Sequence, residues 1–318
     1  MEPILEARNL KVFYRTRKGF VHAVDDVSFA VALGETLGVV GETGCGKSTL
    51  GKAILGILPP KTKVEGALEF AGKDLLSLSQ EGLRKIRGKD IGLIFQDPMT
   101  RLDPLFTIEQ HFVETVRAHE NVSKREALTR ARNSLAGMGI PEGRLENYPH
   151  EFSGGMRQRI MIAMSLVMNP KLLIADEPTT SLDVIVEAQI LEILGDLKRA
   201  YKMSLLLITH NLGIVAEVCD RVAVMYAGRI VELGGVRDVF KRPVHPYTRG
   251  LLSSIIHLES KELSSIDGLP PDLITPPSGC RFHPRCAYAK EICEREDPAW
   301  VEFRPGQFAT CHFGRDFL

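Results

Sequence analysis

The chain lacks the features of a membrane-spanning or secreted protein. Within its 318 residues, no apolar run approaches the ~18 consecutive residues that a bilayer-spanning helix needs. Its start, Met-Glu-Pro-Ile, leads into mixed acidic and basic residues rather than the basic and apolar segments of a signal peptide. We therefore expect a soluble, cytoplasmic protein that reaches a membrane only when a partner recruits it.

Net charge and internal repeats are also missing. Lys plus Arg and Asp plus Glu both number 40, and the chain has no strong basic run. The composition therefore gives no sign of binding to nucleic acid or another polyanion. The length is sufficient for one large domain with an appendage.

A glycine-rich segment follows an apolar, β-rich stretch (35–40) and precedes a helical pattern (48–55). Its residues are Gly41, Glu42, Thr43, Gly44, Cys45, Gly46, Lys47, Ser48 and Thr49. Glycines leave backbone N–H groups free to point at phosphate oxygens, and a helix N-terminus adds partial positive charge. We expect Lys47 to reach the β- and γ-phosphates of ATP and the Ser48 hydroxyl to bind Mg²⁺. Because Cys45 lies inside this segment, we also expect a thiol reagent to block nucleotide binding.

A second apolar stretch ends in two carboxylates. Residues 171–175 are typical of a buried strand, and Asp176 and Glu177 follow directly. Ligands of open α/β sheets bind at the carboxyl ends of strands. At this position the Asp176 carboxylate is suited to bind Mg²⁺ through a water molecule. The Glu177 carboxylate is suited to activate an attacking water molecule.

A second candidate anion site lies between these two motifs. It comprises Ser153, Gly154, Gly155 and Met156, ahead of a helical run at 160–168. A hydroxyl, two unencumbered backbone amides and a helix start suit phosphate oxygens. One chain needs only one phosphate cradle for each nucleotide, so a second one requires an explanation.

The order of the three motifs resembles the ATP-binding cassette, the motor of ABC transporters. The resemblance implies that two cassettes face each other, with each ATP held between the glycine-rich loop of one and Ser153–Met156 of the other. It implies that His210, after the apolar run 204–208, contacts the γ-phosphate. It also implies that Gln96, after the strand pattern at 91–95, helps to bind Mg²⁺ and water and senses the membrane partner.

Two further segments match the cassette pattern. Tyr14, after the β-rich run 5–12, matches the aromatic residue that stacks on adenine, with Phe13 as the alternative. Residues 178–183 resemble the loop that crosses the interface between two cassettes.

Strand and helix patterns predict an α/β fold. We expect a cassette at 1–240, with a RecA-like parallel sheet core beside an antiparallel β subdomain that contains strands at 5–12, 24–31 and 64–70. Residues from about 98 to 158 lose the strand pattern and show helical spacing, which predicts a helical subdomain.

Residues 241–318 form a C-terminal extension with a Pro-rich linker at 268–277 and four cysteines. The cysteines are Cys280, Cys286, Cys293 and Cys311, spaced C-x5-C-x6-C-x17-C. Disulfides are disfavoured in the cytosol, so this density indicates a metal site, with four ordinary cysteines as the alternative. The spacing is loose for zinc, and four thiolates also suit a [4Fe–4S] cluster. His283 and His312 are candidate replacement ligands.

A closer resemblance covers the whole chain. Residues 96–100, 152–159 and 245–248, together with the four cysteines, are similar to the ATP-binding subunit of oligopeptide and dipeptide ABC importers. In some members of that branch these cysteines hold a [4Fe–4S] cluster. The resemblance implies two transmembrane permease subunits, an extracytoplasmic solute-binding protein and a second ATPase subunit, in a heterodimer or a homodimer. It places the chain peripherally on the cytoplasmic face of the inner membrane.

We therefore expect an ATPase, with ATP and Mg²⁺, that powers import of di- and oligopeptides. The same motor could serve oligosaccharides or metal chelates, because a motor subunit does not touch the cargo. A soluble cassette ATPase acting on DNA or ribosomes is disfavoured, since no second cassette or long coiled-coil insertion is present. A further alternative makes the tail a redox sensor that regulates the cassette.

Overall fold

The structure is a computed structural model that describes residues 2–95, 101–179, 184–254 and 266–318. The chain divides into two compact units. The first runs to Leu76 and resumes at Ile208, and the second spans Ser77–Leu207. None of the helices in these residues combines the length and apolar character needed to cross a membrane.

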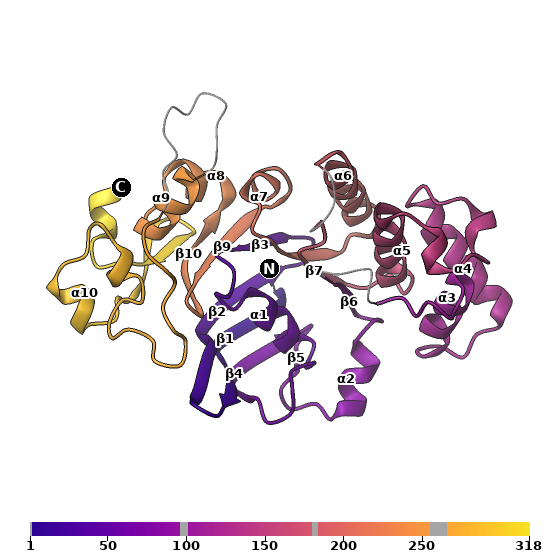
Figure 1. The fold of residues 1–318 in the computed structure, drawn as a ribbon, viewed down its shortest axis with the longest axis horizontal. Helices are drawn as coiled ribbons and strands as arrows, with labels where there is room; N and C mark the ends of the chain where they lie inside the picture. Colours follow the sequence, from indigo (N-terminus) through magenta and orange to yellow (C-terminus); the bar gives the residue numbers. More distant parts are fainter. Residues whose placement is uncertain (1, 96–100, 180–183, 255–265) are drawn as a thin grey trace. The chain divides into compact units, whose positions relative to one another are not determined.

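An antiparallel sheet opens the first unit (Figure 1). Its order is β2-β1-β4-β5, with β1 Pro3–Thr16, β2 Gly19–Ala32, β4 Lys63–Phe70 and β5 Lys73–Asp74. All three predicted β segments lie inside these strands and pair antiparallel, so the antiparallel β region is confirmed. Apolar side chains of β1 such as Leu5, Leu10 and Val12 are fully buried.

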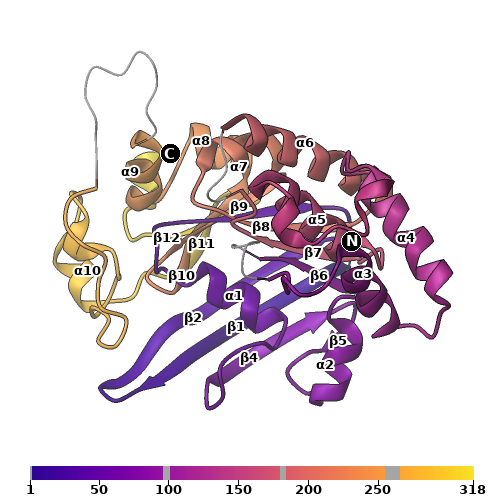
Figure 2. The ribbon, with the colours of Figure 1, turned by 45° about the vertical axis from the view of Figure 1, so that its right-hand side comes forward.

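The second sheet of this unit is mixed. Its strands follow the order β11-β12-β10-β9-β3, where β3 (Thr36–Val40) and β9 (Arg221–Tyr226) are parallel. The others are β10 Arg229–Gly235, β11 Trp300–Arg304 and β12 Gln307–Thr310, paired antiparallel. Two strands of the C-terminal extension therefore continue the sheet (Figure 2), a feature that the sequence analysis missed.

Helices of the first unit are short. They are α1 Lys47–Ile54, α7 Leu212–Val218, α8 Val236–Lys241, α9 Pro246–Ser253 and α10 Glu291–Arg295, with 3₁₀ turns at His283–Arg285 and Gly314–Phe317. Pro246 occupies the first turn of α9, where a missing N–H is harmless, and the His245 side chain caps it by accepting the Tyr247 N–H. The extension packs into the core, because Tyr247 and Phe282 are buried against Val40 and Tyr226.

In the second unit, β8 Ser204–Ile208, β7 Leu172–Asp176 and β6 Ile91–Ile94 are neighbours in that order, with β6 and β7 parallel. The helices are α2 Gln80–Ile86, α3 Ile108–Arg117, α4 Lys124–Ala136, α5 Gly154–Leu166 and α6 Val184–Tyr201, with 3₁₀ turns at Glu142–Arg144 and Pro149–Glu151. Helices therefore occupy the predicted helical region, and α5 begins before, and ends just short of the end of, the helical run expected at 160–168. Buried Phe112, Ala131 and Leu135 match the predicted helical spacing.

Candidate functional site

The glycine-rich segment joins β3 to α1, as the sequence predicts. Gly41 and Gly46 have φ of 152° and 109°, in the region that favours glycine. A Cβ atom at Gly41 would lie 2.0 Å from the Met225 carbonyl oxygen, and one at Gly46 would lie 2.0 Å from the Ala23 carbonyl oxygen. Both glycines are therefore required by close backbone contacts as well as by φ.

Lys47 is the first residue of α1, directly after this loop. Its side chain is buried, and its Nζ donates to the carbonyl oxygens of Gly41 at 2.8 Å and Glu42 at 3.0 Å. Thr43 and Gly44, by contrast, are exposed at the tip. The loop thus combines one ammonium group with an accessible backbone at the start of α1, which suits a phosphate chain.

Tyr14 and Phe13 point to opposite faces of β1, as neighbouring residues of a strand do. The Tyr14 hydroxyl donates to Thr49 Oγ1 in α1 at 3.1 Å. Phe13 instead contacts the His22 ring, with ring centroids 4.2 Å apart. Of the two candidate adenine-stacking residues, only Tyr14 bonds to the helix that begins in the glycine-rich loop.

His210 lies just beyond β8. The preceding residue, Thr209, donates its N–H to the Val39 carbonyl oxygen at 3.1 Å. His210 therefore follows directly on a backbone contact to β3, the strand that leads into the glycine-rich loop, and its side chain is exposed.

The two candidate hydrolytic carboxylates lie in the second unit. Asp176 is the last residue of β7, and both Asp176 and Glu177 are half-buried. Glu177 has φ of 48°, an uncommon conformation for a non-glycine residue that concentrates at functional sites. The turn is fixed from α5, since Gln158 Nε2 donates to the Pro178 carbonyl oxygen.

The Ser-Gly-Gly motif forms the open start of α5. Ser153 is the N-cap, and its Oγ accepts the Met156 N–H at 3.4 Å. A Cβ atom at Gly154 would meet nothing within 4 Å, so this end of the helix is uncovered within the described residues. Gln158, which the sequence analysis did not single out, links this helix to the Glu177 turn and could have been recognised only from the fold.

Some predicted residues lie outside the described residues. These are Gln96 and its neighbours to Thr100, and residues 180–183 of the segment that resembles the interface loop.

Cys45 is buried, and burial raises the pKa of its thiol despite nearby Lys47. A buried, protonated thiol is a poor nucleophile. The expected blocking by a thiol reagent therefore faces a kinetic barrier that the sequence did not show.

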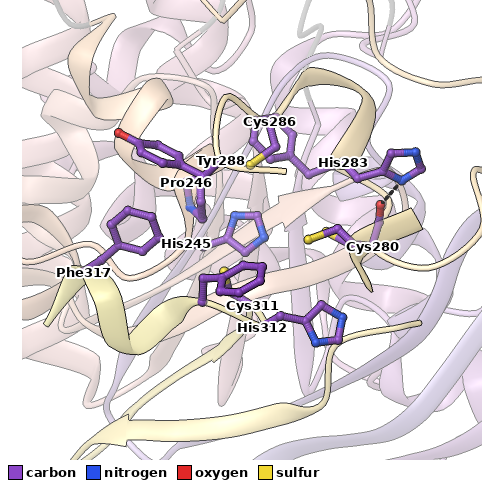
Figure 3. A pocket seen from close by; sticks show the side chains of 12 residues that line it. His245, Pro246, Cys280, His283, Cys286, Tyr288, Cys311, His312 and Phe317 are labelled. Carbon is purple, nitrogen blue, oxygen red and sulfur yellow. Dashed lines mark hydrogen bonds between the residues drawn. The ribbon is translucent and has the colours of Figure 1, made fainter. Parts of the chain in front are cut away.

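The four tail cysteines come together. They line one small cavity of about 20 Å³, and its walls also include His245, Phe282 and Phe313. Figure 3 shows the Cys280 and Cys286 sulfurs turned into this pocket, which His283 also lines, with its ring bonded to the Cys280 carbonyl oxygen. His312 likewise donates to a backbone carbonyl, that of Glu296, at 2.9 Å.

Burial raises the pKa of three of these thiols, to about 11 for Cys280, to about 12 for Cys311, and above its ordinary value for Cys286. Backbone hydrogen bonds from Phe282 and Phe313 oppose the rise. In the described part of the chain, no group of three or more His, Cys, Asp or Glu residues has an arrangement ready to hold a metal ion. The pocket thus gathers the cysteines without a preformed coordination geometry.

A strand, a glycine-rich phosphate loop, a helix and the mixed sheet around them define a nucleotide-binding cassette. Comparison with protein families agrees. Residues 24–180 match the ABC transporter family, and residues 231–293 match the oligopeptide/dipeptide transporter C-terminal region.

Individual relatives are similar over almost the whole chain. The oligopeptide transport ATP-binding protein of Escherichia coli is 46% identical over 314 residues, covering 98% of this chain and 93% of that relative. The dipeptide transport ATP-binding protein of Bacillus subtilis is 50% identical over 304 residues, covering 94% and 91%.

Solved structures also match. The dimeric post-hydrolysis ATP-binding cassette MJ0796 with ADP and phosphate aligns at TM-score 0.66 and 26% identity, over 73% of this chain and 99% of that one. CbiO1 of Clostridium perfringens, part of an ABC transporter complex, aligns at TM-score 0.66 and 32% identity, over 76% and 92%. The chain belongs to the ABC transporter ATPases, in the branch of oligopeptide and dipeptide transport ATP-binding proteins.

Proposed function

We propose that this chain hydrolyses ATP to drive import of dipeptides or oligopeptides through a membrane permease. The observation that carries the proposal is the combination of a phosphate loop between β3 and α1 with similarity to peptide-transport ATP-binding proteins over nearly the full length. The match of residues 231–293 to a region characteristic of peptide transporters supports the cargo class.

ATP binds on residues 41–49 in this proposal. The loop amides and the Lys47 ammonium face the phosphates, and Tyr14 stacks on adenine. Mg²⁺, held by Ser48, Gln96 and Asp176, neutralises charge on the β- and γ-phosphates when it is bound. The burial of Lys47 against loop carbonyls and the Tyr14–Thr49 hydrogen bond support these roles.

Glu177 orients and deprotonates the attacking water, and His210 contacts the γ-phosphate. The left-handed backbone of Glu177 supports this role, because the surrounding chain holds the residue in an otherwise unfavourable conformation. Ser153, Gly154, Gly155 and Met156 bind the ATP of a second cassette, so that nucleotide closes the dimer. The uncovered start of α5 supports a ligand that comes from a partner.

The partners in this proposal are two transmembrane permease subunits, an extracytoplasmic solute-binding protein and a second ATPase subunit, identical or not. The chain acts peripherally, on the cytoplasmic face of the inner membrane. Residues 1–240 form the motor, with the helical region 98–158 docking on the permease, and residues 241–318 form the extension.

The extension holds a metal centre through Cys280, Cys286, Cys293 and Cys311 in this proposal. A [4Fe–4S] cluster is favoured over Zn²⁺, and such a group supplies a cross-link between loops when it is bound. Convergence of four thiols on one apolar pocket fits this group, as do backbone hydrogen bonds to three of them. Because the cavity measures only about 20 Å³, loading requires the cysteine loops to move apart.

Replacing the proposed base tests the motor role. We expect Glu177→Gln to bind ATP with wild-type affinity but to lower turnover by at least about 100-fold, because general-base assistance is removed. The matched control is Glu192→Gln, which changes an exposed carboxylate of α6 and should leave turnover unchanged. If Glu177→Gln hydrolyses ATP at the wild-type rate, Glu177 is not the general base.

A further inference from the structure

The C-terminal extension makes two direct contacts with one residue of the phosphate loop, Glu42. The Glu42 backbone N–H donates to the Tyr247 hydroxyl oxygen at 2.9 Å. Its carboxylate accepts two hydrogen bonds from Arg285, one to each oxygen, at 2.7 and 3.0 Å. Such two-point arginine–carboxylate pairs are directional as well as strong.

Arg285 is held firmly. Its guanidinium also donates to the carbonyl oxygens of Asp267 at 2.9 Å and Ile266 at 3.2 Å, and it lies over the Tyr226 ring. Only 6% of its side chain is exposed, against 26% for Glu42. A side chain with this many fixed partners can impose a position on the more exposed Glu42.

Tyr247 is held by packing. It is fully buried, and its ring centroid lies 4.6 Å from that of Tyr226 and 5.4 Å from that of Phe282. The three rings form one cluster, which leaves the Tyr247 hydroxyl little freedom to follow a moving loop.

Arg281, which lies in the same segment (280–286) as Arg285, supports the other side of the loop. Gly228 donates its N–H to the Cys45 carbonyl oxygen at 2.9 Å. Arg281 bonds the neighbouring Ala227 carbonyl oxygen and forms a buried ion pair with Asp25. Residues 280–286 therefore direct two buried arginines toward the loop region while their two cysteines face the pocket of Figure 3.

Charge gives the Arg285 contact a consequence for nucleotide binding. Glu42 adjoins Gly41 and places a carboxylate on a loop that must receive a chain of negative phosphates. Left unpaired and partly buried, that carboxylate would repel them with little screening. We propose that Arg285 and Tyr247 are positioning residues for ATP binding: Arg285 neutralises Glu42, and together they fix the loop backbone at that residue.

This inference rests on the proposed role of residues 41–49 as the ATP phosphate site. The test measures the Kd for ATP by titration calorimetry on the full-length chain in Mg²⁺. We expect Arg285→Met to raise the Kd about tenfold, and Tyr247→Phe to raise it about threefold because one hydrogen bond to the loop is lost. Turnover at saturating ATP stays at the wild-type value.

Rescue separates the charge argument from a general loss of structure. In the Arg285→Met background, Glu42→Gln should bring the Kd back to within about twofold of wild type, because the unpaired charge is gone. Arg295→Met is the matched control, since this arginine pairs with Glu291 on the exposed surface, and it should bind ATP normally.

Three results decide the matter. A wild-type Kd in Arg285→Met overturns the inference, and so does a loss that Glu42→Gln fails to restore, which would mean that Arg285 only supports the fold of the extension. Lys47→Ala is measured in parallel and should abolish binding. If Lys47→Ala binds ATP normally, the loop is not the phosphate site and the proposed function fails with it.

Discussion

At the residue scale, the sequence identified the residues of the glycine-rich loop but not the distant residues that contact them. The glycines, Lys47 and Ser48 are recognisable because their spacing itself encodes a strand–loop–helix turn. The partners of Glu42 are not recognisable in this way, since Tyr247 and Arg285 are 205 and 243 positions away along the chain. Only the fold brings them together.

Cys45 shows how burial changes a prediction at this scale. Because burial raises the pKa of its thiol, we expect alkylation of the native chain near neutral pH to be at least about tenfold slower than alkylation of the unfolded chain. Once modified, the chain should fail to bind ATP, since the thiol lies inside the loop.

Mass spectrometry of Cys45 over time, with and without denaturant, checks this rate. Equal rates in both states would contradict the buried, protonated thiol. Full ATP affinity after alkylation would contradict its place in the binding loop.

At the scale of elements, patterns of apolar residues predicted the strands and helices of the cassette well. Ser204–Ile208 begins and ends where the sequence indicated. The strands β11 and β12 were missed because they are short and much of β11 is exposed. The strand β12 pairs with β10, a partner about 75 residues earlier, and β11 in turn pairs with β12.

Glu232 of β10 anchors the extension to the sheet. It is fully buried, and its carboxylate accepts the N–H groups of Val244 and His245 at 2.9 Å and the Gln307 amide at 2.8 Å. We expect Glu232→Ala to destabilise the chain by about 2–4 kcal/mol, because three buried donors lose their acceptor. Urea unfolding measures this effect, with exposed Glu294→Ala as the control.

Glu232 also predicts a pH dependence. Burial raises the pKa of its carboxyl group and outweighs the hydrogen bonds that lower it. Because the folded pKa lies above the unfolded one, the contribution of this group is complete below the unfolded pKa and is lost as pH rises through the folded pKa. The stability of wild type relative to Glu232→Gln should therefore fall as the pH rises above the ordinary pKa range of a glutamate carboxyl group. A pH-independent difference would contradict the raised pKa.

At the scale of the whole molecule, the sequence predicted the motor and its family but left the tail chemistry open. Spacing alone could not choose between zinc and an iron–sulfur cluster, and the compact cysteine pocket does not choose either. Purified anaerobically, the full-length chain should be brown and contain about four iron and four sulfide per chain. Cys286→Ser should lower both.

About one zinc per chain, with no colour, would replace the cluster by a structural zinc site. If the purified chain contains no metal, the proposed metal centre is wrong. Either result would leave the phosphate-loop assignments standing, because they depend on different residues.

The central claim is that this chain powers peptide import. The most direct measurement is ATP-dependent uptake of a labelled tripeptide into membrane vesicles that contain the chain with its permease subunits and solute-binding protein. We predict accumulation that requires ATP and disappears with Glu177→Gln, and no accumulation of an oligosaccharide or a metal chelate. Uptake of either of those solutes in place of the peptide, or peptide uptake that survives Glu177→Gln, would contradict the account.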